Sequence, residues 1–263
     1  MENWLDIQGR VVIVTGGSNG IGKSIAAGLR EAGAITVAAD LRPPADGAED
    51  YFPCDVTKQA DVERLMDAVH SRFGRIDALV NNAGVNRPGL LVDTKQPGSR
   101  YEVNEADYAL TMDVDVKGVV LASQAAARKM IAANKGVIVN ISSTSGQPGS
   151  VGQSLYAAAK AAVNSLTRSW GKELGKYGIR VVAVTPGIHE KTLLNSSDAY
   201  LDALAYTRGK TRDQVDDNYT SSIPLGRVGT LSEIADLVCY LISDRASYIT
   251  GTVVNVSGGK TTA

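Results

Sequence analysis

Residues 11–22 read VVIVTGGSNGIG, a branched apolar run followed at once by a loop rich in glycine. A continuous branched run is typical of a strand that is covered on both faces of a parallel sheet. The pattern at 20–32 then predicts a helix, which Gly33 ends. A glycine loop between a strand and a helix predicts a dinucleotide site, because the free N–H groups and dipole of the helix N-terminus attract phosphate.

The same alternation of short apolar runs and longer amphipathic runs continues along the chain. It predicts strands at 35–39, 77–80, 137–141, 180–185 and 252–256, and helices at 61–73, 105–133, 154–177 and 231–243. Helices between strands imply right-handed crossovers, so we expect an α/β fold with a Rossmann-like, doubly wound parallel sheet and helices on both faces. No stretch is long enough to be a linker, and residues 1–263 are predicted to form a single domain.

Composition excludes several classes of protein. Hydrophobic residues make up 44% of the 263 residues and the net charge is only -1, which excludes overall disorder and a general nucleic-acid or membrane-surface binder. Two cysteines and two histidines predict neither a disulfide framework nor a metal site. The N-terminal residues lack an apolar signal region and no long apolar span follows, so we expect a cytoplasmic protein with no membrane contact.

Two segments break the alternation, residues 86–104 (the first loop segment) and residues 186–224 (the second loop segment). Both are polar and weakly periodic, and both follow the expected carboxyl end of a strand. Long irregular segments in compact domains are usually functional, and open α/β sheets bind ligands at that edge. We therefore predict that both segments contact the substrate.

The residues of the nucleotide half have separate expected roles. In the glycine loop (residues 16–22), Gly16 permits a tight turn, Gly20 lets backbone approach a pyrophosphate and Gly22 lets helix and strand pack closely. Asp40, at the end of the second strand, can accept hydrogen bonds from a ribose and would repel a 2′-phosphate, which favours NAD over NADP. Arg42 is a signal in the opposite direction, since its side chain could meet that phosphate.

A tyrosine and a lysine lie one helical turn apart at Tyr156 and Lys160. Oxidation of an alcohol needs a base, and the pKa of free tyrosine, about 10, is too high for that role at neutral pH. A nearby ammonium and a positive nicotinamide ring would lower it. Ser143, 13 residues earlier and at a strand end, is expected to hold the substrate oxygen. The second pair at this spacing, Tyr206 and Lys210, follows no strand and is predicted to lie at the surface or in the substrate loop.

These motifs resemble those of the short-chain dehydrogenase/reductase family over nearly the whole chain. The resemblance implies a catalytic role for Ser143, Tyr156 and Lys160, and for Asp115 at a position where the family usually has Asn. The resemblance also implies a proton relay that uses the backbone carbonyl of residue 115. The predicted cofactor-binding residues are Gly16, Ser18, Asn19, Gly20, Ile21, Gly22, Asp40, Leu41, Asp55, Val56, Asn81, Asn82, Ala83, Gly84, Tyr156, Lys160, Pro186, Gly187, Ile188 and Thr192.

The variable loops resemble a narrower branch of that family, which oxidises D-sorbitol 6-phosphate to D-fructose 6-phosphate with NAD. The stretches that carry this resemblance are 81–86 with 90–93, 186–192 and 258–261. A sugar-alcohol phosphate needs cations at one end and hydroxyl partners along the other. The predicted substrate residues are Ser145, Gln153, His189, Glu190, Lys191 and Arg87. Further cations in the two loop segments are Lys95, Arg100, Arg208, Lys210 and Arg212.

Three other functions remain open at this point. An enzyme of the same family could act on an unphosphorylated polyol or ketose, or reduce a 3-oxoacyl thioester. A dinucleotide-sensing regulator without turnover is the third. The family commonly assembles through its two long helices, here 105–133 and 154–177, and these carry small residues suited to close packing, so we expect a homotetramer. Those small residues are Ala122, Ala125, Ala126, Ala161 and Ala162.

Overall fold

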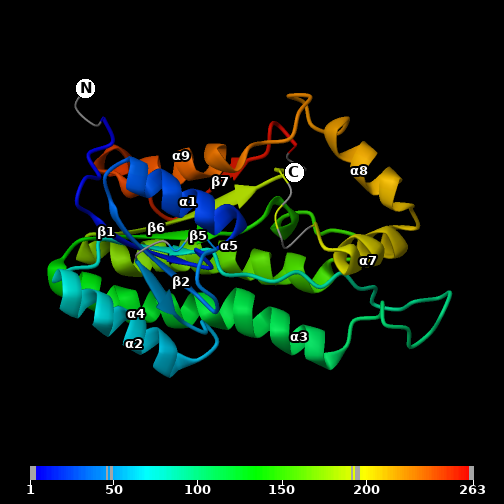
Figure 1. Cartoon of the computed structure of the whole chain (residues 1–263), viewed down its shortest axis with the longest axis horizontal. Helices are drawn as coiled ribbons and strands as arrows, with labels where there is room; N and C mark the ends of the chain where they lie inside the picture. The colour runs from blue at the N-terminus through cyan, green and yellow to red at the C-terminus, as the bar shows by residue number, and fades with distance from the viewer. Residues whose placement is uncertain (1–3, 46, 48–49, 191, 193–195, 261–263) are drawn as a thin grey trace.

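The computed structural model of the chain describes residues 4–45, 47, 50–190, 192 and 196–260. Across these ranges seven parallel strands form one sheet in the order β3-β2-β1-β4-β5-β6-β7 (Figure 1). The strands are β1 (Val11–Thr15), β2 (Ile35–Asp40), β3 (Tyr51–Pro53), β4 (Ala78–Asn81), β5 (Gly136–Ile141), β6 (Ile179–Pro186) and β7 (Thr252–Val256). The predicted Rossmann-like fold is confirmed. Strand β3 was not among the strands predicted from the apolar pattern; it is a short edge strand that ends in a proline, which edge positions tolerate.

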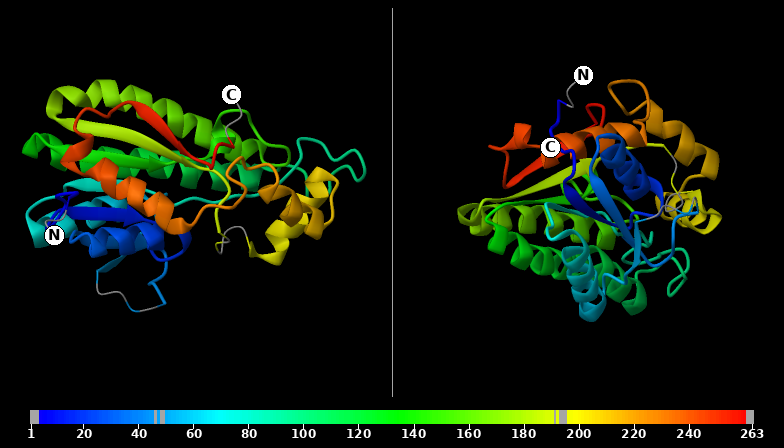
Figure 2. Two further views of the ribbon diagram at one scale, coloured as in Figure 1. Left: turned by 90° about the horizontal axis from the view of Figure 1, so that it is seen from above. Right: turned by 60° about the vertical axis from the view of Figure 1, so that its left-hand side comes forward.

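Helices cover both faces of the sheet (Figure 2). One face carries α1 (Gly20–Glu31) and α9 (Leu231–Ile242), and the other carries α2 (Gln59–Phe73), α4 (Gly118–Ala133) and α5 (Ser154–Leu174). The predicted helix at 105–133 is continuous but not regular. It consists of α3 (Glu105–Met112), a π-helical turn at Asp113–Lys117 and then α4. Single π-helical turns within α-helices are frequent at functional sites.

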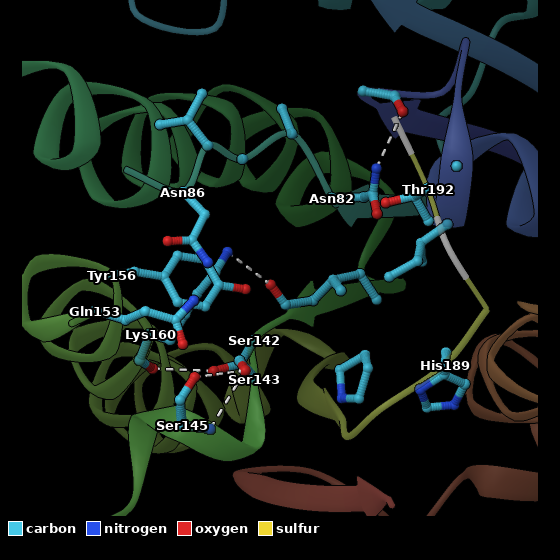
Figure 3. Close-up of a pocket in the computed structure, with 18 of the residues that line it drawn as sticks. Asn82, Asn86, Ser142, Ser143, Ser145, Gln153, Tyr156, Lys160, His189 and Thr192 are labelled. Carbon is cyan, nitrogen blue, oxygen red and sulfur yellow. Dashed lines mark hydrogen bonds between the residues drawn. The ribbon is translucent and has the colours of Figure 1, made fainter. Parts of the chain in front are cut away.

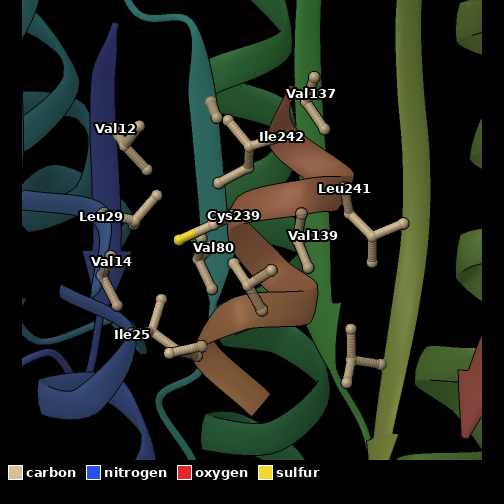
Figure 4. Packing of buried hydrophobic residues seen from close by; sticks show 14 of the residues in the cluster. Val12, Val14, Ile25, Leu29, Val80, Val137, Val139, Cys239, Leu241 and Ile242 are labelled. Atoms are coloured by element: carbon tan, nitrogen blue, oxygen red, sulfur yellow. The ribbon is translucent and has the colours of Figure 1, made fainter. Parts of the chain in front are cut away.

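The branched strand residues are buried because a helix lies against each face. Figure 4 shows Cys239, Leu241 and Ile242 of α9 packed over Val80 of β4 and Val139 of β5. Complete burial of one such side chain contributes about 1.5–3 kcal/mol. The start of α9 is fixed by a capping box between the side chains and backbone N–H groups of Thr230 and Glu233. These packed layers provide a rigid base for the loops at the carboxyl ends of the strands.

The second loop segment is more ordered than the sequence indicated. It contains α7 (Asp198–Arg208) and α8 (Arg212–Thr220), which project beyond the sheet next to the first loop segment (Figure 1). Ser197 caps α7 by accepting the N–H of Tyr200, and Leu204 packs with Val215 in a small separate core. The helical periodicity of the sequence is weak in this segment because these two helices bury few apolar residues.

No helix in the described ranges combines the length and the apolar character needed to span a bilayer.

Candidate active site

A cavity of about 930 Å³ opens at the carboxyl ends of the central strands. Its lining comes from the loops after β1, β2, β4, β5 and β6 and from the two loop segments. Strands β1 and β4 are neighbours in the sheet although two strands separate them in sequence. This is the switch point at which doubly wound sheets bind ligands.

The glycine loop closes one end of the cavity. A Cβ on Gly22 would lie 2.1 Å from the carbonyl oxygen of Gly16, so only glycine allows α1 to start this close to β1. Asn82 holds the loop from the neighbouring strand, since its Nδ2 donates to the carbonyl oxygens of Thr15 and Gly16 at 3.1 and 3.0 Å. Asn19 precedes α1, and its side chain makes no capping hydrogen bond, which leaves the helix N-terminus to a ligand. The loop therefore fits a pyrophosphate.

Asp40 lies at the end of β2 with its carboxylate held in place by backbone. Its Oδ2 accepts the N–H of Ser18 at 3.1 Å, and its Oδ1 accepts the N–H of Leu41 at 2.7 Å. The Ser18 side chain is fully buried and donates to the carbonyl oxygen of Arg42, so Ser18 supports Asp40 and does not line the cavity itself. The carboxylate is fixed at the edge where a ribose would lie.

Residues 81–84, at the end of β4, include one fully turned into the core and three on the cavity lining. Asn82, Ala83 and Gly84 line the cavity, whereas Asn81 is buried and its Nδ2 donates to Ser123 and Asn140, both at 2.8 Å. Successive strand residues point to opposite faces, which is why Asn81 faces the core. The structure therefore does not place Asn81 where a cofactor could touch it.

The remaining predicted cofactor residues fall into two groups. Gly22, like Ser18 and Asn81, lies outside the lining, where it serves packing. Thr192 lies against Gly20, because a Cβ on that glycine would approach the Thr192 Cβ to 3.1 Å. The others on the lining are Gly16, Asn19, Gly20, Ile21, Asp40, Leu41, Asp55, Val56, Asn82, Ala83, Gly84, Tyr156, Lys160, Pro186, Gly187, Ile188 and Thr192.

Ser143, Tyr156 and Lys160 meet in the middle of this cavity (Figure 3). Ser143 follows β5 and starts a short 3-10 turn, with its Oγ 2.7 Å from the Oγ of Ser145. Tyr156 and Lys160 are on one face of α5, and the Lys160 Nζ is 5.5 Å from the centre of the Tyr156 ring. The Lys160 ammonium also donates to the carbonyl oxygen of Ile141 at 3.2 Å. A hydroxyl donor, a phenol and an ammonium therefore share one site.

The pKa of Tyr156 is raised in the protein. Burial is the largest cause and the Asp115 carboxylate is the second, while the hydrogen bond from Ser143 acts the other way. From the sequence we expected Lys160 and a nicotinamide ring together to lower this pKa. The protein's own groups act in the opposite direction, because burial removes the phenolate from water.

Asp115 lies behind the cavity rather than on its lining. The π-helical turn directs it inward, where it is fully buried and its Oδ1 accepts the N–H of Val85 at 2.8 Å. Its Oδ2 has no hydrogen-bond partner among the described residues. Burial raises the pKa of Asp115, and the charge of Lys160 partly offsets that effect. Asp115 therefore contacts Val85 and lies next to Lys160 without lining the cavity itself.

The predicted substrate residues are only partly brought together. Ser145, Gln153, His189 and Glu190 line the cavity, whereas Arg87 is exposed and outside its lining. Lys191 lies outside the described residues. Burial lowers the pKa of His189, because it disfavours the charged imidazole.

Tyr200 is a cavity residue that the sequence analysis did not predict. It comes from α7, and its hydroxyl accepts from Gln153 Nε2 at 3.1 Å and from Asn86 Nδ2 at 3.4 Å. Only the packing of α7 against the N-terminus of α5 brings these three side chains together. They form a polar wall near Tyr156 (Figure 3 labels Asn86 and Gln153).

Tyr206 joins the two loop segments outside the cavity lining. Its hydroxyl donates to Asp93 Oδ2 at 2.7 Å, and its ring stacks on Tyr101 with centres 4.0 Å apart. It is thus a structural contact within the substrate region.

Comparison with known proteins agrees with this geometry. The family model described as Enoyl-(Acyl carrier protein) reductase matches residues 16–261. Sorbitol-6-phosphate 2-dehydrogenase of Klebsiella pneumoniae is 52% identical over 266 residues, covering 99% of each chain. The 3-oxoacyl-(acyl-carrier-protein) reductase FabG of Thermotoga maritima is 34% identical, covering 96% of this chain and 98% of that one.

A solved structure extends the similarity to three dimensions. The ligand-free aldohexose dehydrogenase of Thermoplasma acidophilum superimposes with a TM-score of 0.83 at 30% identity, covering 97% of this chain and 95% of the other. The chain belongs to the short-chain dehydrogenase/reductase family.

Proposed function

We propose that this protein is an NAD-dependent dehydrogenase that oxidises D-sorbitol 6-phosphate to D-fructose 6-phosphate. One observation carries the choice of substrate: the relative named for this reaction is 52% identical over 99% of both chains. The shared cavity of the glycine loop, Ser143, Tyr156 and Lys160 supports the reaction type. The residues on the lining fit a dinucleotide at one end and an alcohol at the other.

Enzymes of this family use NAD or NADP. We propose NAD for this chain, because the Asp40 carboxylate is fixed by two backbone N–H groups at the edge where a ribose would lie. A carboxylate there accepts hydrogen bonds from two hydroxyls and repels a 2′-phosphate. The side chain of Arg42 is exposed and does not line the cavity, so it does not balance that repulsion.

In the catalytic step, the alcohol loses a hydride and a proton to two different acceptors. The glycine loop and Asp40 would hold NAD, which would supply the hydride acceptor for the carbon that bears the reacting hydroxyl. Tyr156 takes the hydroxyl proton as its phenolate, so the alcohol becomes a carbonyl and the phenol is restored. Ser143 holds the substrate oxygen, and Ser145 orients Ser143 through the 2.7 Å contact between their hydroxyls. Lys160 stabilises the phenolate by its positive charge.

Asp115 is proposed as a positioning residue in this mechanism. Its carboxylate fixes Val85 next to the 82–84 turn and lies 4.0 Å from Lys160 Nζ. The raised pKa of Tyr156 implies that oxidation becomes faster as the pH rises, because a larger fraction of the phenol is then ionised.

The chain is proposed to work as one domain in which the two loop segments form the substrate side. We also propose a homotetramer. Ala122, Ala125 and Ala126 are buried in the core, but Ala161 is exposed on α5 and offers a small-residue face to another copy. Sedimentation as a monomer would exclude that assembly.

Replacement of Tyr156 tests the reaction type. Tyr156→Phe is expected to lower kcat by about 10²- to 10⁴-fold, the usual contribution of a general base, while NADH still binds. Tyr248→Phe is the control, since Tyr248 is fully exposed and lies outside the cavity lining. Full activity in Tyr156→Phe would reject the mechanism.

A substrate panel tests the proposed substrate. NADH formation is compared for sorbitol 6-phosphate, sorbitol and a 3-hydroxyacyl thioester. We expect a clear preference for the phosphorylated polyol. A preference for the thioester would favour the function of the relatives at 34% identity, and no turnover with any substrate would favour a cofactor-sensing protein.

A further inference from the structure

Cationic side chains are scarce on the lining of the cavity. Among the described residues that line it, the Lys and Arg side chains are those of Lys160, Arg208 and Lys260. Lys160 belongs to the catalytic group. The other cations of the two loop segments that the structure describes, Arg87, Lys95, Arg100, Lys210 and Arg212, are not on the lining. Arg212, for example, is paired with Asp198 and Asp202 on the outside of α7.

Arg208 is held at the entrance to α5. It is the last residue of α7, and its Nη2 donates to Gln153 Oε1 at 3.2 Å and to Ser150 Oγ at 3.3 Å. Gln153 is three residues before Tyr156, so the guanidinium lies on the substrate side of the cavity and not beside the glycine loop.

Lys260 reaches the same cavity from the far end of the chain. The preceding Gly258 and Gly259 have φ values of +61° and +88°, and this left-handed turn folds the tail against the loop after α8. The N–H of Leu225 donates to the carbonyl oxygen of Gly258 at 3.0 Å, and the Lys260 Nζ donates to Ser222 Oγ at 2.5 Å. The half-buried ammonium is therefore fixed on the lining.

The two cations influence each other. Burial lowers the pKa of Lys260, and the positive charge of Arg208 lowers it further. An anion bound between these two side chains would be attracted by both positive charges.

We propose that Arg208 and Lys260 form the binding site for the phosphate group of the substrate. This inference rests on the proposed function and adds the residues that distinguish a phosphorylated from an unphosphorylated polyol. The phosphate is at the opposite end of the sugar chain from the carbon that is oxidised. With that carbon at Tyr156, the intervening hydroxyls lie along the wall of Tyr200, Gln153 and Asn86. A planar guanidinium and an ammonium are the side chains that proteins use for this group.

The test compares two substrates in four variants. Lys260→Met and Arg208→Met each remove one charge, and Lys210→Met removes an exposed charge just after α7 as the matched control. For sorbitol 6-phosphate, kcat/KM is expected to fall about 10- to 100-fold in the first two variants, mainly through KM. For unphosphorylated sorbitol, kcat/KM in Lys260→Met stays within about twofold, because that substrate makes no phosphate contact. The kcat/KM of Lys210→Met is expected to equal that of the wild type with both substrates. Lys260→Arg, which keeps the positive charge, is expected to retain most of the wild-type kcat/KM for sorbitol 6-phosphate.

The outcomes separate this inference from the proposed function. If the wild type uses both substrates equally, the proposed function fails. If the wild type prefers the phosphorylated substrate and both charge-removing variants keep that preference, the phosphate site is elsewhere and this inference is overturned. Inorganic phosphate gives a second measurement: it is expected to compete with sorbitol 6-phosphate in the wild type and to lose this effect in Lys260→Met. Equal inhibition of both proteins would also overturn the inference.

Discussion

The Oδ1 of Asp115 lies 4.0 Å from the Nζ of Lys160, and the exposed fractions of the two side chains are 0% and 5%. The shorter bonds of each group are made with backbone: Asp115 accepts the N–H of Val85, and Lys160 donates to the carbonyl oxygen of Ile141. The pair is therefore an electrostatic contact next to the reacting phenol rather than a closed salt bridge. Its negative member influences Tyr156 through space.

The pH dependence of turnover should shift when that negative charge is removed. The Asp115 carboxylate is the second cause, after burial, of the raised pKa of Tyr156. In Asp115→Asn we expect the rising limb of kcat/KM against pH to move to lower pH, with higher relative activity on the acid side. Asp113→Asn, an exposed carboxylate on the same π-helical turn, is the control and should keep the wild-type profile. An unchanged profile in Asp115→Asn would show that the carboxylate does not act on the phenol.

Folding stability should also depend on Asp115 in a pH-dependent way. Its pKa is raised on folding, so its contribution to stability is full below the unfolded pKa, about 4, and is lost as the pH rises through the folded value. Asn at this position can still accept the N–H of Val85 and cannot ionise. We therefore expect Asp115→Asn to raise Tm relative to the wild type at neutral pH and to change it little in acid. If the difference in Tm between Asp115→Asn and the wild type were larger in acid than at neutral pH, the raised pKa of Asp115 would be contradicted.

Cofactor choice should depend on the charge of Asp40. In Asp40→Asn the side-chain oxygen can still accept the N–H of Leu41, but the repulsion of a 2′-phosphate is lost. We expect the ratio of kcat/KM for NAD to that for NADP to fall by at least about tenfold. Asp67→Asn, which changes an exposed carboxylate on α2, should leave the ratio as it is. A ratio that does not move in Asp40→Asn would remove the basis for proposing NAD.

The start of α1 should not tolerate a side chain at Gly22. In Gly22→Ala the new Cβ would lie 2.1 Å from the carbonyl oxygen of Gly16, so the loop must move. We expect a lower Tm and weaker NADH binding, which a fluorescence titration measures. Gly175→Ala is the control, since its Cβ would meet nothing within 4 Å and its φ of -55° suits alanine, so its Tm should be equal or higher. Normal NADH binding by Gly22→Ala would show that the loop can adjust.

Local patterns in the sequence were enough to predict the central part of the fold. The run at 11–14 and the glycine loop follow one another directly, so neighbouring residues alone predict β1, the turn and α1. Strand β3 and helices α7 and α8 were missed because their sequences are short or nearly polar, and tertiary contacts stabilise them.

The direction of individual side chains was harder to predict than the elements that carry them. Asn81 and Ser18 lie in the expected motifs, yet the pleat of β4 and the turn after β1 point both side chains away from the cavity. Arg208 and Lys260 are distant in sequence and meet on one cavity only because α7 and the C-terminal turn fold toward α5. No local pattern contains that information.

The contact of Tyr206 with Asp93 and Tyr101 couples the first loop segment to α7. Neither can swing outward alone without losing a hydrogen bond and an aromatic stack, so an outward movement of one segment should carry the other with it. NMR relaxation dispersion should then give a single exchange rate for amides on the two segments, and Tyr206→Phe should split it into two.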